Sequence, residues 1–99
     1  MTLYAVVGFD HEPHAMSLRD SVRPEHRAYY LNSCLNIRMA GAFYRDENQC
    51  GTLVIVEASS EEVVRKWLDS EPFCQAGVYR DLEIREWRPA LNVLEQHHW

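Results

Sequence analysis

The sequence predicts an α+β domain whose elements follow the order β-α-β-β-α-β. Four segments rich in β-branched and aromatic residues are separated by two segments whose apolar residues recur at spacings of three and four. One helical segment lies between the first and second strands, and the other lies between the third and fourth strands. At 99 residues the chain has the length of one domain. We therefore expect a single domain over residues 1–99, with a core over residues 2–88 and a C-terminal extension over residues 89–99.

The first strand is predicted over residues 2–9 and the first helix over residues 24–36. The strand segment reads TLYAVVGF and ends at Asp10. Pro24 is typical of the first turn of a helix, where its missing N–H needs no partner. Three apolar residues then recur at helical spacing, and we expect them to face the core: Ala28, Leu31 and Leu35.

His26 falls in the first turn of this predicted helix. The positive end of the helix dipole disfavours the imidazolium there, so a neutral imidazole able to accept a proton is expected near neutral pH. On spacing alone, a surface or half-buried helix residue without a chemical role is the simpler interpretation.

The second and third strands are predicted over residues 37–44 and 52–58, joined by a polar hairpin loop over residues 45–51. Gly41 interrupts the second strand, and a glycine inside a strand often marks a bulge or the close approach of a ligand. The third strand reads TLVIVEA, with four consecutive apolar residues that point to both faces of the sheet. We expect this strand to be buried on both faces.

The second helix is predicted to begin after Ser59 and to end before Pro72. Ser59 and Glu62 have the spacing of a capping box, in which each side chain bonds the other residue's backbone N–H. An irregular turn over residues 71–77 then leads to the fourth strand, over residues 78–87. The apolar stripe of the helix consists of Val63, Val64, Trp67 and Leu68.

This order of elements is that of a ferredoxin-like fold, a four-stranded antiparallel sheet with two helices on one face. The other face would be open, although the strand over residues 52–58 is apolar on both sides. In a chain this small, the simplest cover is a second copy of the chain. The sequence therefore predicts a homodimer through the open sheet face, and we expect residues 89–99 to pack at that dimer.

Charge and composition exclude several classes of partner. The net charge is −5 and Lys66 is the single lysine, which argues against nucleic acid and against an anionic membrane surface. No apolar run approaches the roughly 20 residues of a membrane span, and the N-terminal residues lack the pattern of a signal peptide. Three widely spaced cysteines without a C-x-x-C motif predict free thiols, no disulfide or zinc site, and a cytoplasmic protein.

Four motifs occur along the chain: Asp10 at the end of the first strand, Arg23-Pro24-x-His26, Ala40-Gly41, and Glu71-Pro72-Phe73-x-x-Ala76-Gly77-Val78-Tyr79. In their order and spacing, from Leu3 to about Trp87, they resemble the YciI-like (YCII-related) proteins. The resemblance implies a dimeric α+β barrel, similar in architecture to muconolactone isomerase and to small antibiotic-biosynthesis monooxygenase-type proteins, with no metal or organic cofactor. One branch of that family is a dehydrochlorinase of a chlorinated hydroxyquinol.

The resemblance also implies a catalytic pair of one histidine and one aspartate. Carried over to this chain, the histidine is His26 and the aspartate is Asp10, which ends the strand that precedes the helix of His26. The family commonly has Asp-Pro after the second helix, where this chain has Glu71 before Pro72, so Glu71 is the alternative partner of His26. The substrate-binding candidates are Arg23, which could pair with an anionic group, Gly41, Glu71 and Phe73.

No metal site is predicted. His11, Glu12 and His14 form a small H-x-x-H cluster in a polar loop. Because zinc sites need three or four converging ligands, we interpret this cluster as a solvated loop.

Two functions remain open at this point. The first is a cofactor-independent, lyase- or isomerase-like enzyme, in which His26 oriented by Asp10 moves a proton on a small aromatic or enol-forming substrate. The second is a non-catalytic module that binds a small metabolite or a partner through the same dimeric fold. The enzyme requires Asp10 and His26 within hydrogen-bond reach of each other at the mouth of a pocket wide enough for a ring.

Overall fold

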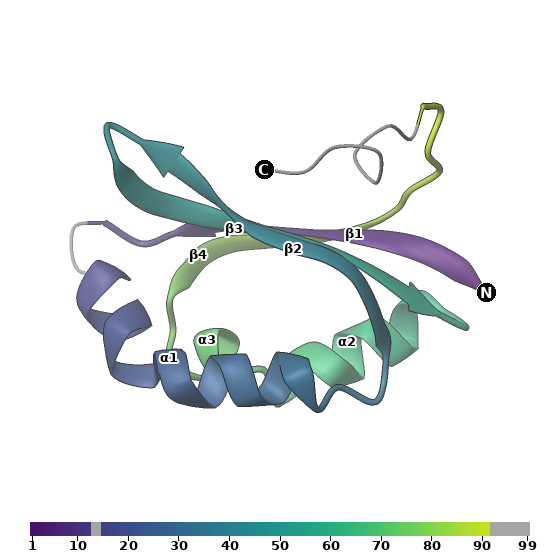
Figure 1. Cartoon of the computed structure of the whole chain (residues 1–99), viewed down its shortest axis with the longest axis horizontal. Coiled ribbons are helices and arrows are strands. Elements are labelled where there is room, and N and C mark those ends of the chain that lie inside the picture. Colours follow the sequence, from purple (N-terminus) through teal and green to yellow (C-terminus); the bar gives the residue numbers. More distant parts are fainter. Residues whose placement is uncertain (13–14, 92–99) are drawn as a thin grey trace.

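The chain forms one antiparallel sheet covered on one face by helices (Figure 1). The structure is a computed structural model and describes residues 1–12 and 15–91. The strand order is β2-β3-β1-β4, so β1 and β3 are central. This arrangement confirms the predicted ferredoxin-like α+β fold. In chain order the elements are β1 (Thr2–Asp10), α1 (Ala15–Leu31), β2 (Asn36–Arg45), β3 (Asn48–Ala58), α2 (Glu61–Asp69), α3 (Pro72–Gln75) and β4 (Tyr79–Glu86).

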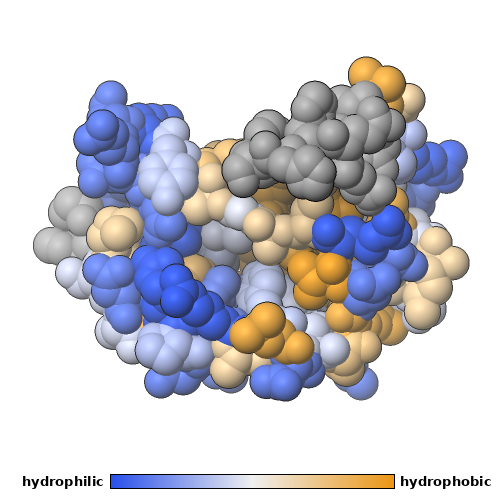
Figure 2. Space-filling view, in the orientation of Figure 1, coloured by the Kyte–Doolittle hydropathy of each residue, from blue (hydrophilic) through white to orange (hydrophobic). Residues whose placement is uncertain are grey.

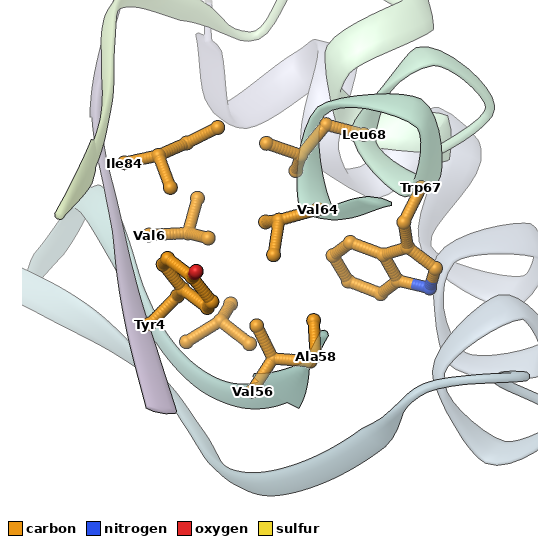
Figure 3. Close-up of a cluster of buried hydrophobic side chains, with 9 residues drawn as sticks. Tyr4, Val6, Val56, Ala58, Val64, Trp67, Leu68 and Ile84 are labelled. Carbon is orange, nitrogen blue, oxygen red and sulfur yellow. The ribbon is translucent and has the colours of Figure 1, made fainter. Parts of the chain in front are cut away.

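The main core lies between the central strands and α2. Val6 pairs with Val54 of β3 and with Ile84 of β4, and side chains at paired positions lie on the same face of a sheet. The alternate residues of β1 and β3 therefore point together toward the helices, where they meet the apolar stripe of α2 (Figure 3). The buried cluster consists of Tyr4, Val6, Val54, Val56, Ala58, Val64, Trp67, Leu68 and Ile84.

The first helix begins at Ala15 rather than at Pro24, so the prediction that Pro24 lies in a first helical turn is wrong. Pro24 lies inside α1. Residues before Pro24 are helical because they have a buried face of their own: Ala15 packs against Phe73 and Val78, and Arg19 is buried. Tertiary packing thus extends the helix on the N-terminal side of Pro24.

The core-facing side of α1 also differs from the predicted one. Leu31 is 86% exposed and Ala28 is exposed, while Leu35 follows the helix and is half-buried against the main core. The inward side chains of α1 are instead those of Ala15, Leu18, Arg19, Val22, His26, Tyr29 and Tyr30. Ala15, Leu18 and Val22 recur at spacings of three and four, but they precede Pro24, where the predicted helix began.

Three smaller corrections concern element ends. Ser60, not Ser59, is the N-cap of α2, and its hydroxyl accepts the backbone N–H of Val63. The predicted irregular turn after α2 contains the short helix α3. β3 begins at Asn48, because a two-residue turn at Asp46 and Glu47, both with positive φ, closes the β2–β3 hairpin. The tip of this hairpin is hydrophilic (Figure 2).

The face of the sheet away from the helices, called the open face below, is apolar over three strands. Phe9 and Phe43 stack there with ring centroids 5.7 Å apart, above Gly51, where a Cβ would lie 2.9 Å from the Phe43 ring. Phe9 remains 43% exposed. By register, the same face carries Leu3, Ala5 and Val7 of β1, Leu53 and Ile55 of β3, and Met39 of β2, with Asp81, Glu83 and Arg85 along β4.

Within the described residues, no helix is long and apolar enough to cross a membrane. Residues 87–91 leave β4 on the side of the sheet opposite the helices (Figure 1). The predictions for the end of the chain beyond residue 91 and for His14 lie outside the described residues.

Candidate active site

Glu71 is a buried carboxylate that caps α3. It is 1% exposed, and its Oε1 accepts the backbone N–H of Phe73 at 2.6 Å. Its Oε2 accepts the thiol of Cys74 at an Sγ–O distance of 3.5 Å. Pro72 begins α3, as expected for a residue without an N–H at the start of a helix. Burial raises the pKa of Glu71, although the Phe73 N–H, the Cys74 thiol and the charge of Arg19 oppose that change.

His26 lies on the inward side of α1 with its imidazole stacked on the ring of Phe73. The ring centroids are 3.7 Å apart, and the ring of Tyr30 lies 4.3 Å from the imidazole on centroids. Nε2 is buried and has no hydrogen-bond partner among the described residues. It lies 3.9 Å from Oε1 of Glu71, which is too long for a hydrogen bond. The structure therefore brings together His26 and the carboxylate of Glu71 without joining them.

The imidazole of His26 is neutral near pH 7. Burial, together with the positive charges of Arg19, Arg23 and Arg27, lowers its pKa to about 4. The contact with Glu71 is therefore not an ion pair at neutral pH. A neutral imidazole was expected from the sequence through the helix dipole, but His26 lies in the middle of α1, so burial and the arginines are the cause.

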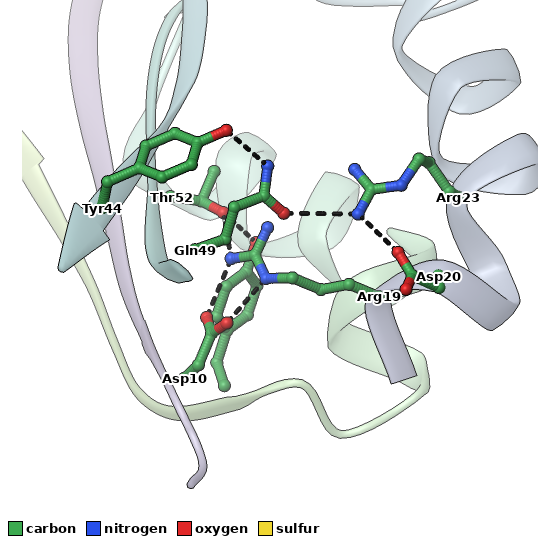
Figure 4. Close-up of polar contacts among 8 residues, drawn as sticks. Asp10, Arg19, Asp20, Arg23, Tyr44, Gln49 and Thr52 are labelled. Atoms are coloured by element: carbon green, nitrogen blue, oxygen red, sulfur yellow. Dashed lines mark hydrogen bonds and ion pairs between the residues drawn. The ribbon is translucent and has the colours of Figure 1, made fainter. Parts of the chain in front are cut away.

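Asp10 is paired with Arg19 in the interior. Arg19 donates from Nε to Oδ2 at 2.6 Å and from Nη2 to Oδ1 at 2.8 Å, and Arg19 is 2% exposed (Figure 4). Both carboxylate oxygens of Asp10 are thereby engaged. Among the described residues, no hydrogen bond or ion pair joins Asp10 to His26. The carboxylate beside His26 is that of Glu71.

Arg19 also reaches a pair of hydroxyl groups. Its Nη2 donates to Oγ1 of Thr52 at 2.9 Å, and the hydroxyl of Tyr79 lies 2.8 Å from the same oxygen. The guanidinium carbon lies 4.9 Å from the centroid of the Phe73 ring. Tyr79 fits against the sheet because residue 8 is glycine: a Cβ on Gly8 would lie 2.7 Å from the Tyr79 ring.

A narrow pocket separates the sheet from the helices beside Glu71. Its empty space is about 180 Å³, and its interior is too narrow to admit a sphere of the size of water. Leu82, which is 40% exposed, is one of its walls. The walls combine aliphatic and hydroxyl-bearing side chains: Val6, Gly8, Tyr30, Thr52, Val54, Leu68, Glu71, Tyr79 and Leu82.

The other predicted site residues lie at different places. Arg23 donates from Nη2 to Asp20 at 3.0 Å and to Gln49 at 3.3 Å, so it ties α1 to β3 (Figure 4). Gly41 is exposed on the edge strand β2, on the open face, where a Cβ would meet nothing within 4 Å. Phe73 is buried and supports His26. The described part of the chain contains no group of three or more side chains that could hold a metal ion.

Three residues of this site were not predicted from the sequence. They are Arg19, Thr52 and Tyr79, which form a hydrogen-bonded network. A usable signal for Arg19 is that it lies seven positions before His26, which is two helical turns on the same face. That signal was lost because the predicted helix began at Pro24. Thr52 and Tyr79 come together only because β3 and β4 belong to the same sheet, and no local sequence pattern indicates this contact.

The fold and the site define a small α+β protein in which Glu71 and His26 lie close together beside a pocket lined by both apolar and polar side chains. The model of the YCII-related domain matches residues 2–88, and the chain belongs to this family. No match was found among functionally curated proteins.

Solved structures share the fold. A 5-chloro-2-hydroxyhydroquinone dehydrochlorinase from Burkholderia phenoliruptrix AC1100, in complex with 2,5-dihydroxybenzoquinone, has a TM-score of 0.76 and 22% identity over 87% of this chain and 93% of that chain. A NIPSNAP domain protein from Burkholderia xenovorans has a TM-score of 0.53 and 13% identity over 91% and 95%. A putative antibiotic biosynthesis monooxygenase from Deinococcus radiodurans has a TM-score of 0.51 and 15% identity over 95% and 99%. At these identities the likeness concerns the fold.

Proposed function

We propose that this protein is a cofactor-independent enzyme of lyase or isomerase type that moves a proton on a small, enol-forming ring, with Glu71 and His26 as the proton-transfer pair. The observation that carries the proposal is Nε2 of His26, which is buried, has no partner among residues 1–12 and 15–91, and lies 3.9 Å from Oε1 of Glu71. A buried polar atom without a partner is rare and commonly marks a functional site. An approach of roughly 1 Å would bring the two atoms within hydrogen-bond reach.

Burial reverses the usual order of proton affinity in this pair. An unperturbed imidazole is more basic than a carboxylate, but here the pKa of Glu71 is raised and that of His26 is lowered to about 4. A proton that enters the pair is therefore held by Glu71, which leaves both groups neutral. A carboxylate whose pKa is raised is a better base than an ordinary one, and beside a neutral imidazole it is suited to accept a proton from one substrate atom and return it to another.

Glu71 is the member of the pair that meets the substrate in this proposal. It lines the pocket, whereas His26 lies behind it against Phe73. The aliphatic walls and the ring of Tyr30 suit a flat substrate, and Leu82 at the exposed wall must move to admit it. The substrate class is supported by the dehydrochlorinase of the same fold, whose structure holds a dihydroxybenzoquinone.

The test uses 5-chloro-2-hydroxyhydroquinone for turnover and 2,5-dihydroxybenzoquinone for binding. Glu71→Gln keeps an oxygen that can accept the Phe73 N–H but removes the site of protonation, so turnover should fall by about 100-fold or more. His26→Gln should lower turnover as well, while Tyr44→Phe, on the exposed hairpin, should not. Unchanged turnover in Glu71→Gln would refute the assignment.

A non-catalytic binding module is the second candidate, and the narrowness of the pocket favours it. This candidate predicts that the wild type binds 2,5-dihydroxybenzoquinone without converting any ring substrate offered, and that Glu71→Gln binds it equally well. Measured binding without turnover would therefore select this function over the first.

We also propose that the protein is a homodimer through the open face. Apolar side chains on this face of three strands, among which Phe9 and Met39 are exposed while Ala5 and Ile55 are buried, support an interface between two copies. Cys34, Cys50 and Cys74 are free thiols, which supports a reducing compartment such as the cytoplasm.

A further inference from the structure

The hydrogen bonds between Arg19, Thr52 and Tyr79 leave one hydroxyl proton unused. A guanidinium only donates, so Oγ1 of Thr52 must accept from Nη2 of Arg19. The hydroxyls of Thr52 and Tyr79 share one further hydrogen bond, and it uses one of their two protons. Whichever hydroxyl donates in that bond, the other keeps a proton that has no acceptor among the described residues.

The hydroxyl group that keeps this proton is part of the pocket wall. Thr52 and Tyr79 both line it, as does Glu71. Tyr79 is held in place by close packing against Gly8, and Thr52 is held by the central strand β3. Burial raises the pKa of the Tyr79 hydroxyl, so it stays protonated. Arg19 only donates to Oγ1 of Thr52, so it consumes neither hydroxyl proton, and it holds that oxygen in place.

We propose that the Thr52–Tyr79 hydroxyl pair, oriented by Arg19, is the donor that binds a carbonyl, enolate or phenolate oxygen of the ligand in this pocket. The assignment rests on the proposed function for the pocket and adds the group that receives the developing negative charge. A fixed donor aimed at such an oxygen stabilises it without reorganisation. The ligand class is thereby narrowed to rings that carry an ionisable hydroxyl or a conjugated carbonyl group.

The experiment measures binding of 4-nitrophenol, whose absorbance separates the phenol from the phenolate, with nitrobenzene as the ligand that lacks the oxygen. The wild type and Leu82→Ala, which widens the pocket, should bind the phenolate in preference to nitrobenzene. Combining Tyr79→Phe with Thr52→Val removes both hydroxyls and should weaken phenolate binding by about tenfold or more, as expected for a hydrogen bond to a charged group. Binding of nitrobenzene should change little.

The single variants distinguish a donor pair from mere packing. Tyr79→Phe leaves the Thr52 proton free and Thr52→Val leaves the Tyr79 proton free, so each should lose less than the double variant. Thr52→Ser, which keeps the hydroxyl, should retain more phenolate affinity than Thr52→Val when each is combined with Tyr79→Phe. Tyr44→Phe, which removes a hydroxyl outside the pocket, should bind as the wild type does. Melting temperatures of all variants verify that they are folded.

Two results would overturn the proposal: phenolate binding by the double variant equal to that of the parent, or no phenolate binding by the wild type and by Leu82→Ala. Failure of the donor-pair proposal can be distinguished from failure of the proposed catalytic function. Loss of phenolate affinity in the double variant together with unaltered turnover in Glu71→Gln would retain the donor pair and reject the proton-transfer pair.

Discussion

Phe73 holds His26 through its ring, on which the imidazole stacks at a centroid distance of 3.7 Å and an interplanar angle of 13°. Its backbone N–H, at the same time, binds Oε1 of Glu71 at 2.6 Å. One residue therefore fixes both members of the candidate proton-transfer pair. The 3.9 Å separation of the pair depends on the packing of the short helix α3.

The lowered pKa of His26 predicts a fall in stability between pH 6.5 and pH 4. The unfolded chain, with its ordinary histidine, takes up a proton in this range and the folded chain does not. His26 therefore imposes no cost above pH 6.5 and lowers the free energy of unfolding as the pH falls to about 4, by about 3 kcal/mol in total. Urea unfolding across this range measures the slope.

His26→Gln is the matching variant, and its stability should vary less with pH over the same range. The raised pKa of Glu71 acts in the opposite direction, since its contribution is present at low pH and is lost as the pH rises through the folded value. Comparison within the Glu71→Gln background isolates the histidine. Parallel pH curves for His26→Gln and its parent would contradict a lowered pKa.

Asp10→Asn should destabilise the fold strongly. The substitution leaves the Arg19 guanidinium buried without its counter-charge, which typically costs about 3–5 kcal/mol. Glu61→Gln provides the control, because it removes one partner of the exposed Glu61–Arg65 pair and should cost less than about 1 kcal/mol. Denaturant unfolding of both variants tests the contrast, and similar small effects would show that Asp10 is not the required counter-charge.

Gly8→Ala should destabilise the protein by roughly 1–3 kcal/mol, because the added methyl group would lie 2.7 Å from the ring of Tyr79. Gly41→Ala is the control in the same sheet, where the new Cβ meets nothing within 4 Å. Thermal unfolding measures both. Equal tolerance of the two substitutions would mean that Tyr79 can leave its place at little cost.

Phe9→Glu should dissociate the proposed homodimer, since it places a charge at the edge of the apolar open face. Leu31→Glu, at an 86% exposed position on α1, should leave the association unchanged. Sedimentation velocity or light scattering at micromolar concentration separates monomer from dimer. A monomeric wild type would rule out the interface.

The sheet could be predicted from the sequence because its signals are local. The run Leu53 to Val56 is apolar on consecutive positions, and β3 is indeed a central strand. The start of α1 could not be predicted in the same way. Arg19 occupies an inward position because it pairs with Asp10 and Thr52, which are distant in the sequence, and Pro24 is tolerated inside the helix.

The site shows the same division between local and distant information. His26 and Glu71 could be proposed because each lies in a short motif, Arg23-Pro24-x-His26 and Glu71-Pro72-Phe73. Which carboxylate accompanies His26 depends on how α3 packs against α1, and the sequence left Asp10 and Glu71 as alternatives. The hydroxyl pair depends on strand pairing across the sheet and had no local signal.

The position of Glu71 at the start of α3 ties the chemistry of the pocket to local order. A carboxylate is a stronger acceptor for the Phe73 N–H than a neutral carboxyl group is. Each proton that arrives on Glu71 therefore weakens the cap of α3, and each departure restores it. Because α3 carries Phe73, protonation of Glu71 in the proposed reaction would also weaken the support of the His26 ring, and deprotonation would restore it.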